Sequence, residues 1–145
     1  LSKLYVALTL SKEFTPTDGT ATNPVTNMTV RGTTIAATFN ASTDDLKVST
    51  ATAADVSPWH DASMYTDATA TYECILLPQT VEAGTLCIRF YIDGKLYEWF
   101  STAALTLEQG KQCTIALTVG RDRVEMGTIT SKPWTVSNQG SLGTK

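Results

Sequence analysis

Apolar and polar residues alternate along several short stretches of the chain, a pattern typical of β-strands that bury one face. The clearest stretches are Lys3 to Leu10 and Cys113 to Val119, where every second residue is apolar. No stretch repeats its apolar residues at the three- and four-residue spacing of an amphipathic helix. Turn-forming residues separate the strands at short intervals, so the pattern predicts an all-β sandwich.

A hairpin around Asp93-Gly94 is the strongest local prediction, because this dipeptide favours the two-residue turn that joins antiparallel strands. Such a turn places Arg89 opposite Glu98, and directly opposed residues share one face of the sheet. That face is polar, whereas the other face is apolar on both strands, which specifies the register. The predicted buried face consists of Leu86, Ile88, Phe90, Ile92, Tyr97 and Trp99.

Further strands are predicted on both sides of this hairpin. Two short strands within Asn27 to Asn40 are divided at Arg31-Gly32, and another spans Thr71 to Leu77. Near the end of the chain, a strand that begins at Val124 pairs back on the preceding one. Gly127 is expected to form a β-bulge in it, which would bring the later apolar residues back into phase.

The composition places the chain among single-core domains. It has 145 residues, of which 42% are hydrophobic, and a formal net charge of −3. We expect one domain over residues 1–134 and a polar tail over 135–145, with a further domain before Leu1 as an open alternative. An acidic chain without a basic cluster is a poor partner for nucleic acid. No apolar run has the length that a membrane-spanning helix needs.

Little in the sequence points to chemistry. His60 is the only histidine, and its neighbours Ser57, Asp61 and Ser63 are too close in sequence to converge into a catalytic relay. We therefore expect no catalytic residues and a solvated loop histidine. The three cysteines lack metal-binding spacing, so we expect three reduced thiols and neither a metal nor a cofactor. Cys87 lies on the Arg89 face and is expected to be the most exposed thiol.

The stretch from Ser49 to Ala70 is the least regular part of the chain. We expect it to cross one end of the sandwich, with a turn of helix near Asp61. Trp59 and Tyr65 lie in this stretch and are candidate surface-binding aromatics, whereas Trp99 is expected in the core. Exposed aromatic rings of this kind are how sugar-binding sandwiches hold their ligands, so a carbohydrate-binding module is one functional hypothesis.

Four motifs in the second half of the chain occur in a distinctive order. They are Leu-Pro-Gln-Thr-Val-Glu-Ala-Gly-Thr-Leu (77–86), Ile-Asp-Gly-Lys-Leu-Tyr-Glu-Trp (92–99), Leu-Thr-Leu-Glu-Gln-Gly-Lys-Gln-Cys-Thr-Ile-Ala-Leu-Thr-Val (105–119) and Ile-Thr-Ser-Lys-Pro-Trp (129–134). In this order they resemble the C-terminal domain of the fimbrillin-like proteins of Bacteroides-type bacteria, the type V pilin superfamily. Cys113 stands where that family usually has an aromatic residue.

The resemblance implies a transthyretin-like Greek-key β-sandwich of about seven strands. It also implies a structural or adhesive subunit of a surface fimbria, anchored at the outer membrane, that is not an enzyme. Its partners would be other fimbrial subunits, identical or different, and host or bacterial surface glycans. Subunits of such a fimbria would join by strand addition, in which one chain completes the sheet of the next.

The first strand is the predicted exchange segment, because it alternates and a loop of about a dozen residues separates it from the next strand. Its buried row would be Leu4, Val6, Leu8 and Leu10, and we expect Lys3 to Leu10 at a sheet edge or beside one. In the family a C-terminal tail is among the elements that reach a neighbour. Residues 135–145 are poor in apolar side chains, so composition favours the first strand.

Overall fold

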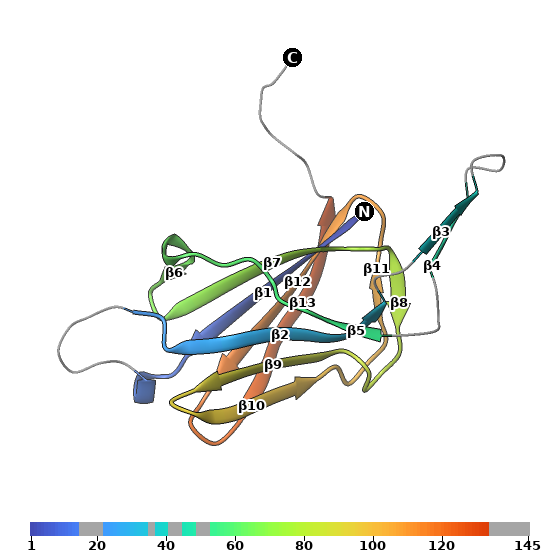
Figure 1. The fold of residues 1–145 in the computed structure, drawn as a ribbon. Helices are drawn as coiled ribbons and strands as arrows, with labels where there is room; N and C mark the ends of the chain where they lie inside the picture. The colour runs from blue at the N-terminus through green and yellow to red at the C-terminus, as the bar shows by residue number, and fades with distance from the viewer. Residues whose placement is uncertain (15–21, 35–36, 41–44, 49–52, 134–145) are drawn as a thin grey trace, which may run out of the picture.

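The chain folds into two main β-sheets that pack face to face, as the computed structural model in Figure 1 shows. The structure describes residues 1–14, 22–34, 37–40, 45–48 and 53–133. The first sheet has the strand order β13 (Val124–Pro133), β12 (Lys111–Val119), β1 (Ser2–Leu10), β7 (Thr69–Leu76) and β6 (Tyr65–Thr66). The second sheet has the order β10 (Lys95–Phe100), β9 (Cys87–Ile92), β2 (Val25–Thr34) and β5 (Ala53–Val56).

The remaining elements are short. Two further sheets have two antiparallel strands each: β3 (Ala37–Asn40) pairs with β4 (Asp45–Val48), and β8 (Gln79–Val81) pairs with β11 (Leu105–Leu107). Two 3-10 turns, η1 (Lys12–Phe14) and η2 (Ala62–Met64), are the helical elements of the described residues.

The predicted all-β class is confirmed, with five and four strands in the main sheets where about seven in total were expected. The Greek-key connectivity and the division into a domain and a tail stay predictions. Residues 134–145, which include Trp134 and the predicted tail, lie outside the described residues.

The central hairpin has the predicted register. Tyr97 pairs with Phe90 and Glu98 pairs with Arg89, whose Nε lies 3.3 Å from a Glu98 carboxylate oxygen. Asp93 and Gly94 both have positive φ angles, 52° and 79°, which is the backbone of the turn expected there. The Phe90 and Tyr97 rings stack with their centroids 5.4 Å apart.

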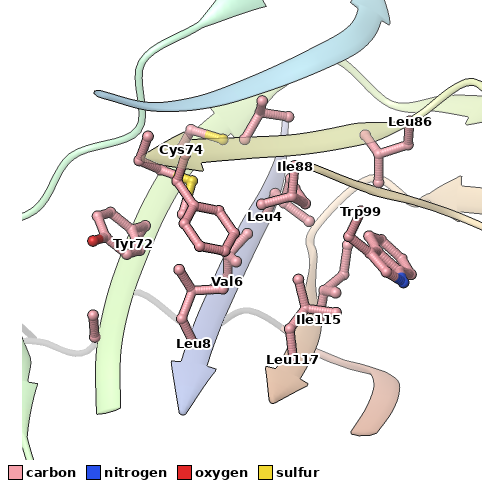
Figure 2. Close-up of a cluster of buried hydrophobic side chains, with 14 of the residues drawn as sticks. Leu4, Val6, Leu8, Tyr72, Cys74, Leu86, Ile88, Trp99, Ile115 and Leu117 are labelled. Carbon is pink, nitrogen blue, oxygen red and sulfur yellow. The ribbon is translucent and has the colours of Figure 1, made fainter. Parts of the chain in front are cut away.

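The hydrophobic core fills the space between the two sheets (Figure 2). Alternate residues of β1, β7 and β12 meet alternate residues of β2, β9 and β10, as the period of two along a strand requires. All the residues of the predicted buried face are buried, and so are the alternate residues of β12. The latter are Cys113, Ile115, Leu117 and Val119.

The prediction that two strands are divided at Arg31-Gly32 is wrong, because β2 runs through both residues as one strand. Gly32 has a φ of 92°, and the register with β5 shifts between Val30 and Thr33. A Cβ at Gly32 would lie 2.1 Å from the Thr85 carbonyl oxygen. Glycine can adopt this positive φ and fits against the neighbouring Thr85 backbone, so β2 continues through the irregularity. A residue with a side chain at this position would end the strand.

The predicted bulge in the last described strand is confirmed. The register between β12 and β13 shifts at Ala116 and Leu117, whose partners are Thr128 and Met126. Gly127 is the extra residue, and the shift places Ile129 rather than Thr128 opposite Ile115. The bulge thus returns the apolar residues of β13 to the inner face of the sheet.

Replacing Phe90 with alanine should test the hairpin register. Phe90 has no exposed surface, so Phe90→Ala is expected to lower the free energy of unfolding by roughly 3–5 kcal/mol in chemical denaturation. Phe100→Ala on the same hairpin is the matched control, because Phe100 is 49% exposed and should cost less than about 1 kcal/mol. Equal costs for the two variants would contradict the assignment of faces.

Candidate functional site

Strand β1 is the candidate exchange segment, and it lies in the middle of the first sheet. It pairs in parallel with β12 on one side and antiparallel with β7 on the other, with eight register pairs on each side. The prediction that Lys3 to Leu10 lies at a sheet edge or beside one is therefore wrong. The alternation found in the sequence identifies the buried face of a strand, but both central and edge strands show it.

The four predicted residues of β1 all point into the core. Leu4, Val6, Leu8 and Leu10 are buried between β7, β12 and the second sheet, and three of them are labelled in Figure 2. Leu4 pairs with a cysteine on each side, and Val6 lies between Tyr72 and Ile115. Without β1, the first sheet would hold an apolar groove flanked by two unpaired backbone edges.

Strand β13 is one of the two outermost strands of the first sheet, and sequence reasoning did not identify it as an exposed edge. Every residue of β13 except Val124 is exposed. Met126 and Ile129 lie opposite core residues of β12, yet they are 46% and 37% exposed. The second sheet therefore does not cover the inner face of β13. The Gly127 bulge and the charges of Glu125 and Lys132 are features that limit uncontrolled pairing at a sheet edge.

The described part of the irregular stretch leads from β5 in the second sheet to β6 in the first, whereas a path over one end of the sandwich stays a prediction. Asp61 caps η2 by accepting the Ser63 backbone N–H at 2.8 Å and the Ser63 hydroxyl as well. These hydrogen bonds, the one from the hydroxyl above all, hold the pKa of Asp61 below its ordinary value. The turn of helix expected near Asp61 is thereby confirmed.

The two candidate aromatics of this stretch have different environments. Trp59 is 59% exposed, whereas Tyr65 is only partly accessible and packs against the core. Trp59 forms an isolated bridge with Glu73 on β7, through backbone hydrogen bonds of 2.6 Å and 3.0 Å. Trp59 is thus available to a ligand, and Tyr65 contributes to packing.

An open hollow of about 420 Å³ lies beside Trp59 on the outer side of the first sheet. Trp59, Ile75 and Val56 provide apolar surface, and Lys3 and Glu73 form an ion pair across β1 and β7. Cys74 and Ser57 complete the lining. Of these residues, sequence reasoning singled out Trp59 as a ligand contact, since Lys3, Glu73 and Ile75 reach it only through strand pairing.

His60 is a structural residue rather than a solvated one. Its Nδ1 lies 2.8 Å from the Thr71 carbonyl oxygen and must donate to it, and its Nε2 accepts from the Asn23 amide at 3.0 Å. The ring also stacks on Tyr72 with a centroid distance of 4.5 Å. Both nitrogens are engaged in a neutral ring, so neither is left to act as a general base. The expectation of a solvated loop histidine is wrong.

All three cysteines are free and buried. Burial raises the pKa of Cys74 to about 12 and that of Cys87 to about 11, and it also raises the pKa of Cys113. The expectation that Cys87 is the most exposed thiol is wrong. Its side chain lies on the outer face of β9, paired with Arg31 and Phe100 in the register, and its Sγ lies 3.8 Å from a Glu98 carboxylate oxygen.

Two further features bear on function. Within the described ranges, no group of three or more His, Cys, Asp and Glu side chains is arranged to hold a metal ion. The described part of the chain also contains no helix of the length and apolarity that crossing a membrane requires.

Comparison with known proteins gives one family and several similar folds. The family model described as fimbrillin-like matches residues 1–134. A solved structure from Bacteroides uniformis ATCC 8492, a proposed cell adhesion protein, is 20% identical with a TM-score of 0.63. Another from Bacteroides ovatus ATCC 8483, with the same description, is 13% identical with a TM-score of 0.64. No curated protein sequence is significantly similar to the chain.

These similarities concern the fold, and each alignment covers a larger share of this chain than of the solved chain. The alignments span 92% and 94% of this chain but only 51% and 46% of the solved chains. The chain therefore spans about half the length of the structures that it matches.

Replacing His60 should reveal a packing role. His60→Ala removes two hydrogen bonds and a stacked ring, so it is expected to lower the free energy of unfolding by about 2 kcal/mol in denaturant titration. Ser57→Ala, in an exposed position of the same segment, is the control and should change it by less than about 0.5 kcal/mol. A neutral His60→Ala variant would refute the structural role.

The thiols should react only after unfolding. At pH 8 the buried, raised-pKa thiols are almost fully protonated, so iodoacetamide is expected to leave the native protein unmodified. Unfolding in guanidinium without reductant should then give three alkylated cysteines by mass spectrometry. An intact peptide linking two cysteines, or rapid alkylation of Cys87 in the native protein, would contradict this assignment.

Proposed function

Because this chain belongs to the fimbrillin-like family, we propose that it is a structural and adhesive subunit of a cell-surface fimbria. The family match over residues 1–134 and the similar folds of two proposed cell adhesion proteins support this role. Its partners would be other fimbrial subunits, either identical or different, and the fimbria would be anchored at the outer membrane. We assign no catalytic role, since His60 is engaged in structural hydrogen bonds.

The central position of β1 is the observation that supports assembly by strand addition. A strand from a neighbouring subunit that replaced β1 would gain hydrogen bonds from both β7 and β12. It would also bury four alternate side chains in the pockets that Leu4, Val6, Leu8 and Leu10 fill. Backbone pairing would provide affinity, and the alternate pockets would provide register.

Exchange of β1 would give an incoming strand two pairing partners, whereas addition at β13 would give it one. At β13 an added strand would pair on one side only, because β12 already occupies the other side. At the β1 position the incoming strand would replace a strand with equivalent contacts, so the net change in buried area is small. Before exchange, the native β1 must detach from the sheet, and this local unfolding is slow.

The C-terminal tail is the competing donor. The family resemblance favours residues 135–145, whereas their composition offers only Val136 and Leu142 as side chains for pockets. The two alternatives differ in which deletion should abolish assembly. They can therefore be separated by experiment.

Deleting residues 1–10 and restoring the strand in trans should test the β1 assignment. The truncated chain is expected to aggregate, and a synthetic peptide of residues 1–11 should return it to a soluble form with the far-ultraviolet circular dichroism of the full chain. A peptide carrying Leu4→Asp and Leu8→Asp is the matched control and should fail, because both residues are fully buried.

Negative-stain electron microscopy of the same variants should distinguish the donors. Deletion of 136–145 is expected to leave fibre formation intact, and the first-strand deletion should abolish it. Ile129→Lys on β13 should also leave fibres intact. If the tail deletion abolishes assembly while the first-strand deletion does not, β1 is not the exchanged strand.

A further inference from the structure

The hollow beside Trp59 combines the two kinds of surface that a sugar ring requires. We propose that it is a binding site for a neutral saccharide, with Trp59 as the stacking platform and the Lys3–Glu73 pair as the polar floor. The site extends the adhesive role of a fimbrial subunit, but it does not rest on strand addition. It lies within one chain, so it would operate whether or not subunits polymerise.

The walls of the hollow are unusually apolar for an exposed surface. Trp59 is 59% exposed and Ile75 is 46% exposed, and both line the same hollow. Single exposed apolar residues are ordinary on protein surfaces, whereas adjacent ones that share a concavity are typical of a contact site. Val56 extends this apolar surface from the end of β5.

The backbone of Trp59 is held in place rather than carried on a free loop. Its N–H donates to the Glu73 carbonyl oxygen and its carbonyl oxygen accepts the Glu73 N–H. This bridge attaches the segment before η2 to β7 and sets the Trp59 ring beside the floor residue. A ligand would therefore meet a platform whose backbone is already ordered, which lowers the entropic cost of binding.

The floor carries two opposite charges that are largely withdrawn from solvent. The Lys3 and Glu73 side chains are 19% and 23% exposed, and their charged groups form an ion pair across β1 and β7. The Lys3 ammonium can donate to a ligand hydroxyl, and the Glu73 carboxylate can accept from one. The Ser57 hydroxyl on the rim offers a third polar contact.

This combination favours a saccharide over a peptide or lipid group. A pyranose ring has polarised C–H groups that suit the negative face of an indole, and hydroxyls that can reach the floor. An apolar side chain would cover the ion pair without replacing its hydrogen bonds to water, which is unfavourable. Because the two charges cancel, the floor gives no preference to an acidic sugar. The volume of about 420 Å³ lies within the roughly 300–1,000 Å³ of ligand sites.

An array of neutral, sialylated and sulphated glycans, probed with the full chain, should test the proposal. At least one neutral glycan should bind, and Trp59→Ala should weaken its binding by about tenfold or more in a calorimetric titration. Trp59→Phe should retain part of the affinity, because an aromatic face remains. Phe100→Ala, an exposed aromatic on the second sheet, is the matched control and should bind within about twofold of the unaltered chain.

A second variant distinguishes the binding of a saccharide from the binding of an apolar group. Lys3→Met combined with Glu73→Met keeps the volume of the floor and removes its polar groups, so saccharide binding should be lost, with circular dichroism confirming the fold. Binding that is unchanged or stronger in this double variant would mean that the hollow takes an apolar group, and the proposal fails. It also fails if no neutral glycan binds, or if Trp59→Ala binds as well as the unaltered chain.

Discussion

The burial of one alternating strand between two others is the constraint on which the rest of this structure depends. Strand β1 places Leu4, Val6, Leu8 and Leu10 under the second sheet and supplies hydrogen-bonding partners to β7 and β12 at once. Those two strands do not pair with each other, so the first sheet exists as one surface only because β1 joins them. The packing of Ile88 and Phe90 from the opposite sheet depends in turn on that continuous surface. The proposed strand addition would use this same position, where a strand pairs on both sides.

Local pairings were predictable from the sequence, and the order of the strands was not. The register around Asp93-Gly94 results from a two-residue turn and from the agreement of two short apolar rows, all within fifteen residues. The Gly127 bulge was detectable in the same way, as a break in phase between Met126 and Ile129. By contrast, the neighbours of β1 lie far along the chain, and its alternation is equally compatible with an edge position. The predicted strand division at Gly32 was wrong for a related reason. The role of this glycine depends on the Thr85 backbone, which approaches from a distant segment.

The candidate sites show the same difference between what local sequence predicts and what long-range pairing decides. Trp59 could be recognised from sequence as an exposed aromatic in an irregular stretch, but its companions Lys3, Glu73 and Ile75 come together only through the pairing of β1 with β7. In the sequence Tyr65 was as good a candidate as Trp59, but in the structure it is partly buried and packs against the core. His60 looked solvated, yet Asn23 and Thr71 reach it from other parts of the fold. Residue type identified the chemistry available, and long-range pairing decided which residues share a site.

The strand order also has a consequence for the time at which the fold can form. Leu4 meets Cys74 and Cys113, so the two partners of β1 lie roughly 70 and 110 residues further along the chain. Contacts between such distant segments form slowly, and a chain made from its N-terminus presents β1 long before either partner exists. We expect the aliphatic side chains of β1 to be the last large apolar surface that is buried as the domain folds. During that interval a strand of the same pattern from another chain would compete for the same two partners on equal terms. The proposed strand exchange would therefore depend on kinetic competition during folding as much as on the stability of the finished domain.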